Sequence, residues 1–162
     1  MRQSNSRPIA FSFVSLLLAF ILAVIDLPDW MDQWRPSWVL LVVFIWFLVA
    51  PNNVGVVVAF FIGLALDLLL GDPLGVNALC LCLVVLICHL QRSRLRIYTE
   101  LQRALFVVAL VVIYQTCYVL LQLIVGNDMS FTIVFAPALT SGIGWLLFSA
   151  PVSRLQRQFG VL

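Results

Sequence analysis

One carboxylate, that of Asp67, lies well inside an apolar stretch of this 162-residue sequence. A charged side chain at the centre of a bilayer costs at least about 2.5–3.5 kcal/mol, so we expect Asp67 to lie near a membrane edge, to be paired or to be protonated. Two roles are open: an ion pair that locks two helices together, or a ligand for an ion or substrate. An aspartyl protease mechanism is excluded, because it needs two acids that share one site and no second acid lies well inside an apolar run.

Arg35 is the expected partner of Asp67. Pro51, Asn52 and Asn53 form a turn signal between two apolar runs, which predicts an antiparallel pair of helices. Arg35 at the start of the first helix and Asp67 near the end of the second then lie at similar depth. We therefore predict that their side chains pair near the outer rim of the membrane.

Small residues precede Asp67 on the same helix face. Gly55, Ala59 and Gly63 come before it at four-residue intervals, a spacing that keeps side chains on one slowly drifting face. Small residues allow close approach of helix backbones in membranes. We expect this face to pack against another helix rather than against lipid.

The segment after Asp67 is predicted to be a tight outer turn. Gly71 can end the helix, Asp72 can cap the next one, and Pro73 suits the first turn of that next helix. Gly75 makes a second glycine at a spacing also seen around phosphates, but the lysine and the hydroxyl residue of a phosphate-binding loop are missing.

A polar stripe runs along a later apolar stretch. Gln115, Tyr118 and Gln122 follow the i, i+3, i+7 spacing of one helix face. This pattern is compatible with hydrogen bonds between helices of the chain, or with a lining for a partner helix.

No residues have the spacing of a metal or redox site. His89 is alone, with no second histidine and no acid at ligand spacing. The four cysteines form no CxxC pair and read as small apolar residues in apolar runs: Cys80, Cys82, Cys88 and Cys117. We expect neither a cofactor nor a metal.

The overall composition indicates the class of protein in which these residues lie. Apolar residues make up 64% of the chain and charged residues 10%, with a mean hydropathy of +1.13, whereas soluble domains are about 45–50% apolar and about 25% charged. The sequence therefore predicts a polytopic membrane protein, and it excludes a nucleic-acid binder, a secreted disulfide scaffold and a soluble enzyme.

Arginines decide the number of crossings. The basic loop formed by Arg92, Arg94, Arg96 and Arg103 and the N-terminal Arg2 and Arg7 are both expected on the cytoplasmic side. Two points on one side require an even number of crossings between them, so the short second apolar run is counted as its own span and not as half of a longer broken helix. Arg154 and Arg157 place the C-terminus inside as well. A single membrane domain over residues 1–162 with an uncleaved first span follows, with six spans predicted at 9–27, 37–50, 54–70, 74–90, 104–125 and 132–150.

The basic loop has three possible uses. It serves as a topology signal in any case. Leu95, Tyr98 and either Leu101 or Gln102 share a helix face with arginines around them. The loop therefore also fits an amphipathic helix on the anionic inner leaflet, or a contact with a cytoplasmic partner.

The residues from Arg35 onward resemble the rod shape-determining protein MreD family. An R-P-x-W-V-L-L opening begins at Arg35 and includes Trp38, a turn is centred on Pro51, and the pattern G-x-x-x-D-L-x-x-G-x-x-x-G falls on Gly63, Asp67, Leu68, Gly71 and Gly75. The chain length, the arginine-rich loop and the RLQRQFGVL ending are similar to the family too.

The resemblance implies a non-catalytic scaffold of cell-wall elongation in the bacterial inner membrane. Members of this family sit beside MreC, with the actin-like MreB and the peptidoglycan enzymes of the lateral wall. It implies that the chain binds the transmembrane helix of MreC, links MreB filaments to peptidoglycan synthesis and is needed for rod shape. No catalytic residue carries over, and the matching positions are taken as architectural or partner-facing: Arg35, Trp38, Gly63, Asp67, Gly71 and Gly75. We place candidate partner contacts on the small-residue face and on the polar stripe.

Similarity of fold suggests an alternative function. The family is similar to the six-helix substrate-binding subunits of energy-coupling-factor vitamin transporters, so a small-molecule transport subunit is the alternative. Such a subunit needs an outward pocket lined by polar side chains, and the candidates are few: Asn77, Gln115, Gln122, Asn127 and Asp128. This scarcity favours the scaffold.

Overall fold

The computed structural model describes residues 6–25, 37–50, 53–95, 97–126, 137, 140–142 and 144–145. Within these residues the chain is helical and contains no strand, so the predicted all-helical class is confirmed. The helices are α1 (Ser6–Val24), α3 (Trp38–Val49), α4 (Val56–Leu70), α5 (Val76–Leu90), α6 (Arg92–Leu95) and α7 (Glu100–Val125). The complete six-helix bundle stays a prediction, because the sixth predicted span, 132–150, falls largely outside the described residues.

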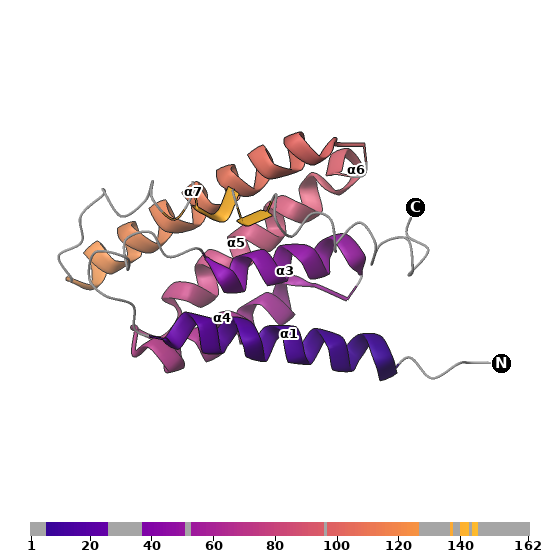
Figure 1. The fold of residues 1–162 in the computed structure, drawn as a ribbon. Coiled ribbons are helices and arrows are strands. Elements are labelled where there is room, and N and C mark those ends of the chain that lie inside the picture. The colour runs from indigo at the N-terminus through magenta and orange to yellow at the C-terminus, as the bar shows by residue number, and fades with distance from the viewer. Residues whose placement is uncertain are drawn as a thin grey trace.

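The long helices alternate in direction (Figure 1). The start of α1, the turn between α3 and α4, and α6 lie at one end of the molecule, on the right of the view. The turn between α4 and α5 and the end of α7 lie at the other end. α3 and α4 are separate helices, since α3 stops at Val49 and the Asn53 N–H donates to the Ala50 carbonyl (3.0 Å) in the turn that follows.

Among the described residues, one helix is long and apolar enough to cross a membrane by length and composition. Residues Leu101–Val125 of α7 form this 25-residue span. The other apolar helical stretches are shorter: Val14–Val24 within α1, Trp38–Val49, Val56–Leu70 and Val76–Leu90. α7 begins four residues before the predicted run at 104, because Thr99 and Gln102 form a reciprocal capping box at its start.

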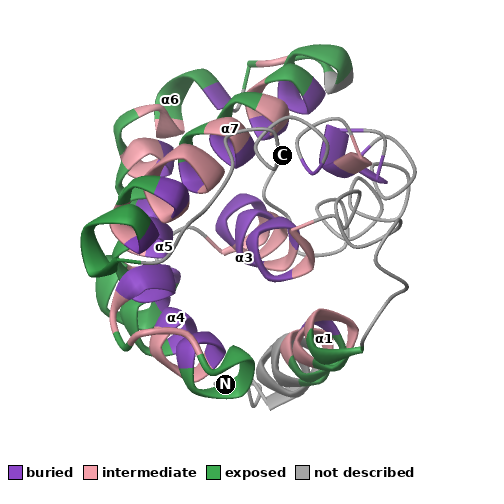
Figure 2. Cartoon of the chain, turned by 90° about the vertical axis from the view of Figure 1, so that its left-hand side faces the viewer, coloured by how far each residue is buried: buried purple, intermediate pink, exposed green. Residues whose placement is uncertain are grey.

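α3 lies at the centre of the arrangement, with α1, α4, α5 and α7 around it (Figure 2). Its sequence is apolar on every side, as expected of a helix enclosed by others. Phe44 on α3 contacts the rings of Phe106 on α7 (5.9 Å between centroids) and Trp145 (5.1 Å). The Trp46 Nε1–H donates to Ser15 Oγ (3.0 Å) and ties α3 to α1. The faces of α4, α5 and α7 turned toward α3 are buried and their outer faces are exposed.

Candidate functional site

The turn between α4 and α5 is shaped by two glycines with positive φ. Gly71 (φ +71°) ends α4 in the left-handed region, and its N–H donates to the Asp67 carbonyl. Gly75 (φ +100°) precedes α5. Residues with a Cβ are strained at such angles, so the turn depends on glycine at both positions. The N-cap of α5 is therefore Gly75, and the prediction that Asp72 caps this helix was wrong.

The Asp67 carboxylate binds the start of α5 from the preceding helix. Its side chain is 0% exposed, and its Oδ2 and Oδ1 accept hydrogen bonds from the backbone N–H groups of Gly75 and Asn77, both at 2.9 Å. The first N–H groups of a helix have no partner within the helix and carry partial positive charge. Asp67 supplies the acceptors that they need, which accounts for a carboxylate at this depth.

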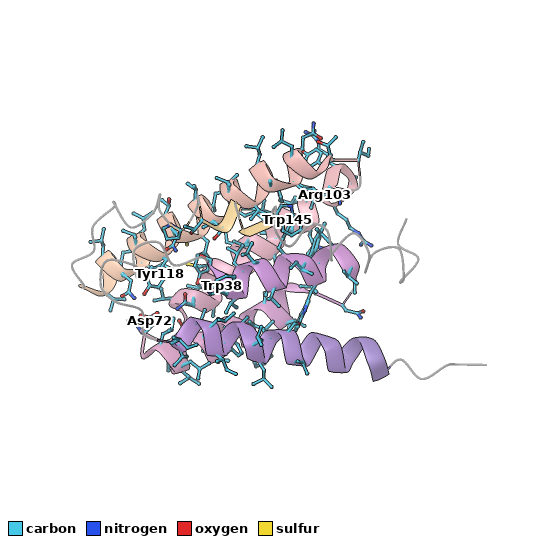
Figure 3. The ribbon with its side chains drawn as sticks, viewed as in Figure 1. Trp38, Asp72, Arg103, Tyr118 and Trp145 are labelled. Atoms are coloured by element: carbon cyan, nitrogen blue, oxygen red, sulfur yellow. The ribbon has the colours of Figure 1, made fainter. Side chains whose placement is uncertain are left out.

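Asp72 is the centre of a second group of hydrogen bonds, which we name the Asp72 cluster (Asp72, Asn77, Tyr114, Tyr118 and Gln122). Asp72 Oδ2 accepts from Asn77 Nδ2 (2.8 Å), and Asp72 Oδ1 accepts from Gln122 Nε2 (3.0 Å). The Tyr118 hydroxyl lies 3.0 and 3.1 Å from the two Asp72 oxygens, toward which it donates. Figure 3 shows Asp72 and Tyr118 together at the end of the molecule where the α4–α5 turn lies.

The cluster joins α7 to the α4–α5 turn. Gln122 Nε2 also donates to the Tyr118 hydroxyl (3.0 Å), and the Tyr114 hydroxyl donates to Asn77 Oδ1. Asn77 is 2% exposed and Gln122 is 1% exposed. The described side chains that donate to Asp72 are all neutral, and their hydrogen bonds hold helices together.

The described polar side chains at this end form hydrogen bonds within the chain. Among the described residues, no three histidine, cysteine or acidic side chains are grouped as metal ligands would be. The Asp67 and Asp72 carboxylates each serve as hydrogen-bond acceptors, and neither is hydrogen-bonded to a serine or cysteine within the described chain. A nucleophile needs an adjacent base to be activated. The arrangement fixes the relative positions of α4, α5 and α7.

Gly63 brings α4 and α5 into backbone contact below the turn. A Cβ at Gly63 would lie 2.4 Å from Ala78 Cα, 2.6 Å from Ala78 N and 2.8 Å from the Asn77 carbonyl oxygen. Ala59, one turn earlier, is 0% exposed. At Gly63 the small-residue face of α4 thus packs against α5 of the same chain, whereas a Cβ at Gly55 would meet no atom within 4 Å.

The remaining predicted residues are spread over both ends. Of the polar stripe, Tyr118 and Gln122 belong to the Asp72 cluster, while half-buried Gln115 makes no side-chain hydrogen bond within the described chain. Trp38 begins α3 next to Ser37, whose N–H donates to Ser141 Oγ (3.1 Å).

Arg35 and the Arg96 side chain lie outside the described residues, so the Arg35–Asp67 pair stays a prediction. The other three arginines of the basic loop lie at the opposite end, with Arg103 buried, Arg92 half-buried and Arg94 exposed.

Asp72, Asn77 and Tyr114 were not predicted to act together. Asp72 and Asn77 are only five residues apart, but Tyr118 lies 46 residues and Gln122 50 residues further along from Asp72. The available signal was depth: Asp72 lies between two predicted spans, Asn77 lies near the start of the second of these, and Tyr118 and Gln122 lie toward the end of the span 104–125.

Comparison with known proteins agrees with the sequence resemblance. The family described as "rod shape-determining protein MreD" matches residues 6–158. A protein of Haemophilus influenzae with that same description is 40% identical over 65 residues, which make up 40% of each chain. No solved structure matches the chain, so the likeness to transporter subunits stays a prediction.

Proposed function

The chain belongs to the MreD family of rod shape-determining proteins, and from this we propose that it is a non-catalytic scaffold in the bacterial inner membrane. Family membership assigns it to the cell-shape and cell-wall system. The observation that carries the scaffold proposal is the use of the polar side chains: the Asp67 carboxylate and the Asp72 cluster hold helices together.

We propose that the chain crosses the membrane several times with both termini in the cytoplasm. The alternation of α1, α3, α4, α5 and α7 supports this, since it puts α6 and the start of α1 at one end. The arginines Arg92, Arg94 and Arg103 lie at this end, as the positive-inside rule requires of a cytoplasmic side. The acids Asp67 and Asp72 lie toward the other end.

The proposed partner is the transmembrane helix of MreC, with MreB and the lateral-wall peptidoglycan enzymes as further members of the complex. Because α5 already packs against α4 at Gly63, we place the contact at Gln115 on α7. A carboxamide in the middle of an apolar span gains from a hydrogen bond across helices. Tyr118 and Gln122 already have such bonds, and Gln115 has none within the described chain.

The same hydrogen bonds argue against the transporter alternative. A pocket for a vitamin needs polar side chains directed into it. Asn77 and Gln122, two of the few candidates, are almost fully buried and are bonded to Asp72. We therefore do not retain the transport function.

Depletion of the protein in its native rod-shaped cell tests the proposal. We expect the cells to become round, and the wild-type chain to restore the rods and to copurify with a single-span partner. Gln115→Leu should keep the protein folded but reduce recovery of the partner at least fivefold, which corresponds to about 1 kcal/mol. Ile113→Leu, a change on the exposed side of the same helix, is the control and should leave recovery unchanged.

Unchanged cell shape after depletion, with loss of vitamin uptake, would contradict the scaffold proposal. Full partner recovery with Gln115→Leu would contradict only the placement of the contact on α7.

A further inference from the structure

The connection between α5 and α7 is folded and fixed to the helix bundle. Successive backbone hydrogen bonds run through it: the Leu95 N–H donates to the Gln91 carbonyl (3.0 Å) and the Ile97 N–H to the Arg94 carbonyl (2.9 Å). Leu95 is 2% exposed and belongs to the core, and the Tyr98 ring contacts the Phe106 ring at 6.4 Å. The Thr99–Gln102 capping box then begins α7. The shape of this connection is therefore preformed.

Large apolar side chains point away from the bundle at this connection. Ile97 is 85% exposed, Leu90 at the end of α5 is 75% exposed, and Leu101 at the start of α7 is 65% exposed. Residues that anchor the connection and residues that project from it thus alternate over a short stretch. The four-residue helix α6 replaces the longer amphipathic helix that the sequence suggested, and it directs Leu95 inward rather than toward lipid.

Positive charge is concentrated in the stretch that carries these projecting side chains. Residues 91–103 contain four arginines and one glutamate, which gives a formal charge of +3. Arg94 is exposed and Arg92 is half-buried. The described acids outside this connection, Asp67 and Asp72, belong to the opposite end of α5.

We propose that this connection is a preformed binding site for an anionic phospholipid, with Arg92 and Arg94 at the phosphate-bearing headgroup and Ile97 among the acyl chains. The pairing of basic and apolar side chains selects a lipid over free phosphate, because only a lipid offers both an anion and hydrocarbon. The site rests on the proposed cytoplasmic placement of this end, since the cytoplasmic leaflet carries anionic lipid. It is independent of the partner contact at Gln115.

Native mass spectrometry of the full chain in neutral detergent tests the site with three probes: phosphatidylglycerol, phosphatidylcholine and free glycerol phosphate. Each arginine near the surface adds about 1 kcal/mol of attraction to anionic lipid, or about fivefold in affinity. Arg92→Gln with Arg94→Gln should therefore weaken phosphatidylglycerol binding about 25-fold and leave phosphatidylcholine binding unchanged. Arg92→Lys with Arg94→Lys should retain most of the affinity, which separates charge from a folding defect.

The matched control is Arg154→Gln with Arg157→Gln, which removes the same charge near the C-terminus and should change phosphatidylglycerol binding less than fivefold. Ile97→Ser should weaken the binding of the lipid but not of glycerol phosphate. Equal weakening by the two glutamine pairs, equal affinity for the two lipids, or glycerol phosphate binding as tight as the lipid would overturn the proposal. So would a glutamine pair at Arg92 and Arg94 that keeps lipid binding but loses rod shape, because the connection would then contact a cytoplasmic protein.

Discussion

Replacing Gly63 with alanine is expected to destabilise the protein by about 3 kcal/mol, the upper end of the usual range for over-packing. The added Cβ would lie 2.4 Å from Ala78 Cα and 2.6 Å from Ala78 N. Both atoms belong to the backbone, so no side chain can rotate away and α4 must separate from α5. Unfolding of the purified protein in bicelles would measure the loss, and complementation of rod shape would measure its consequence in the cell.

Gly55→Ala is the matched control, because it makes the same chemical change at the other end of α4. A Cβ there meets nothing within 4 Å, and the φ of −89° is ordinary; we expect a change below about 1 kcal/mol. Ala78→Gly should fail to rescue Gly63→Ala, since the clash does not involve the alanine methyl group. Unchanged monomer stability with Gly63→Ala, together with loss of partner recovery, would instead mean that this face contacts a partner.

Replacing Asp67 with alanine is expected to cost about 2–6 kcal/mol. The change leaves the N–H groups of Gly75 and Asn77 without their 2.9 Å acceptors in a fully buried place, and each unsatisfied buried donor costs about 1–3 kcal/mol. Asp67→Asn keeps one acceptor oxygen and should lose about half as much. The same unfolding measurement should rank the free energies of unfolding, from highest to lowest, as wild type, Asp67→Asn and Asp67→Ala.

Asp72→Asn is the control for loss of an acidic charge at this end. Its donors come from side chains that can adjust, and the amide oxygen still accepts, so we expect a loss of about 1 kcal/mol. A loss as large as that of Asp67→Ala would show that charge, and not the backbone donors, determines stability here. A double variant that exchanges the charges, Arg35→Asp with Asp67→Arg, is compared with each single charge reversal. It should recover stability only if the predicted Arg35–Asp67 pair contributes more than the two backbone hydrogen bonds of Asp67.

Local pattern was enough to predict the long helices of the described chain, though not the four-residue helix α6. Apolar runs bounded by turn residues, such as the run that ends before Gly71, gave helices close to their observed bounds because burial and backbone hydrogen bonding act within each run. The start of α7 was missed by four residues, since the capping box at Thr99 and Gln102 extends the helix beyond its apolar part.

The sequence pattern did not predict which residues far apart in the chain contact each other. The four-residue spacing up to Gly63 indicated a close helix contact, but nothing in it identified Ala78 as the neighbour. Asp67 was expected to lie near a membrane edge, to be protonated or to pair with Arg35, and backbone donors from α5 were not considered. Asp72 was predicted to cap the next helix from its local sequence alone. Its bonds to Tyr118 and Gln122 depend on how α7 crosses the turn, which the local sequence does not reveal.

If the helices cross the membrane in alternation, as we propose, the two ends of α5 face opposite sides. Leu74 in the α4–α5 turn is 67% exposed and Ser93 in α6 is exposed, so single cysteines at these positions, in a chain without its four native cysteines, can be labelled with a membrane-impermeant maleimide. In intact spheroplasts we predict labelling of Leu74→Cys alone, and labelling of Ser93→Cys only after the membrane is permeabilised. Labelling of both positions from the outside would contradict the membrane arrangement on which the scaffold and the lipid site depend.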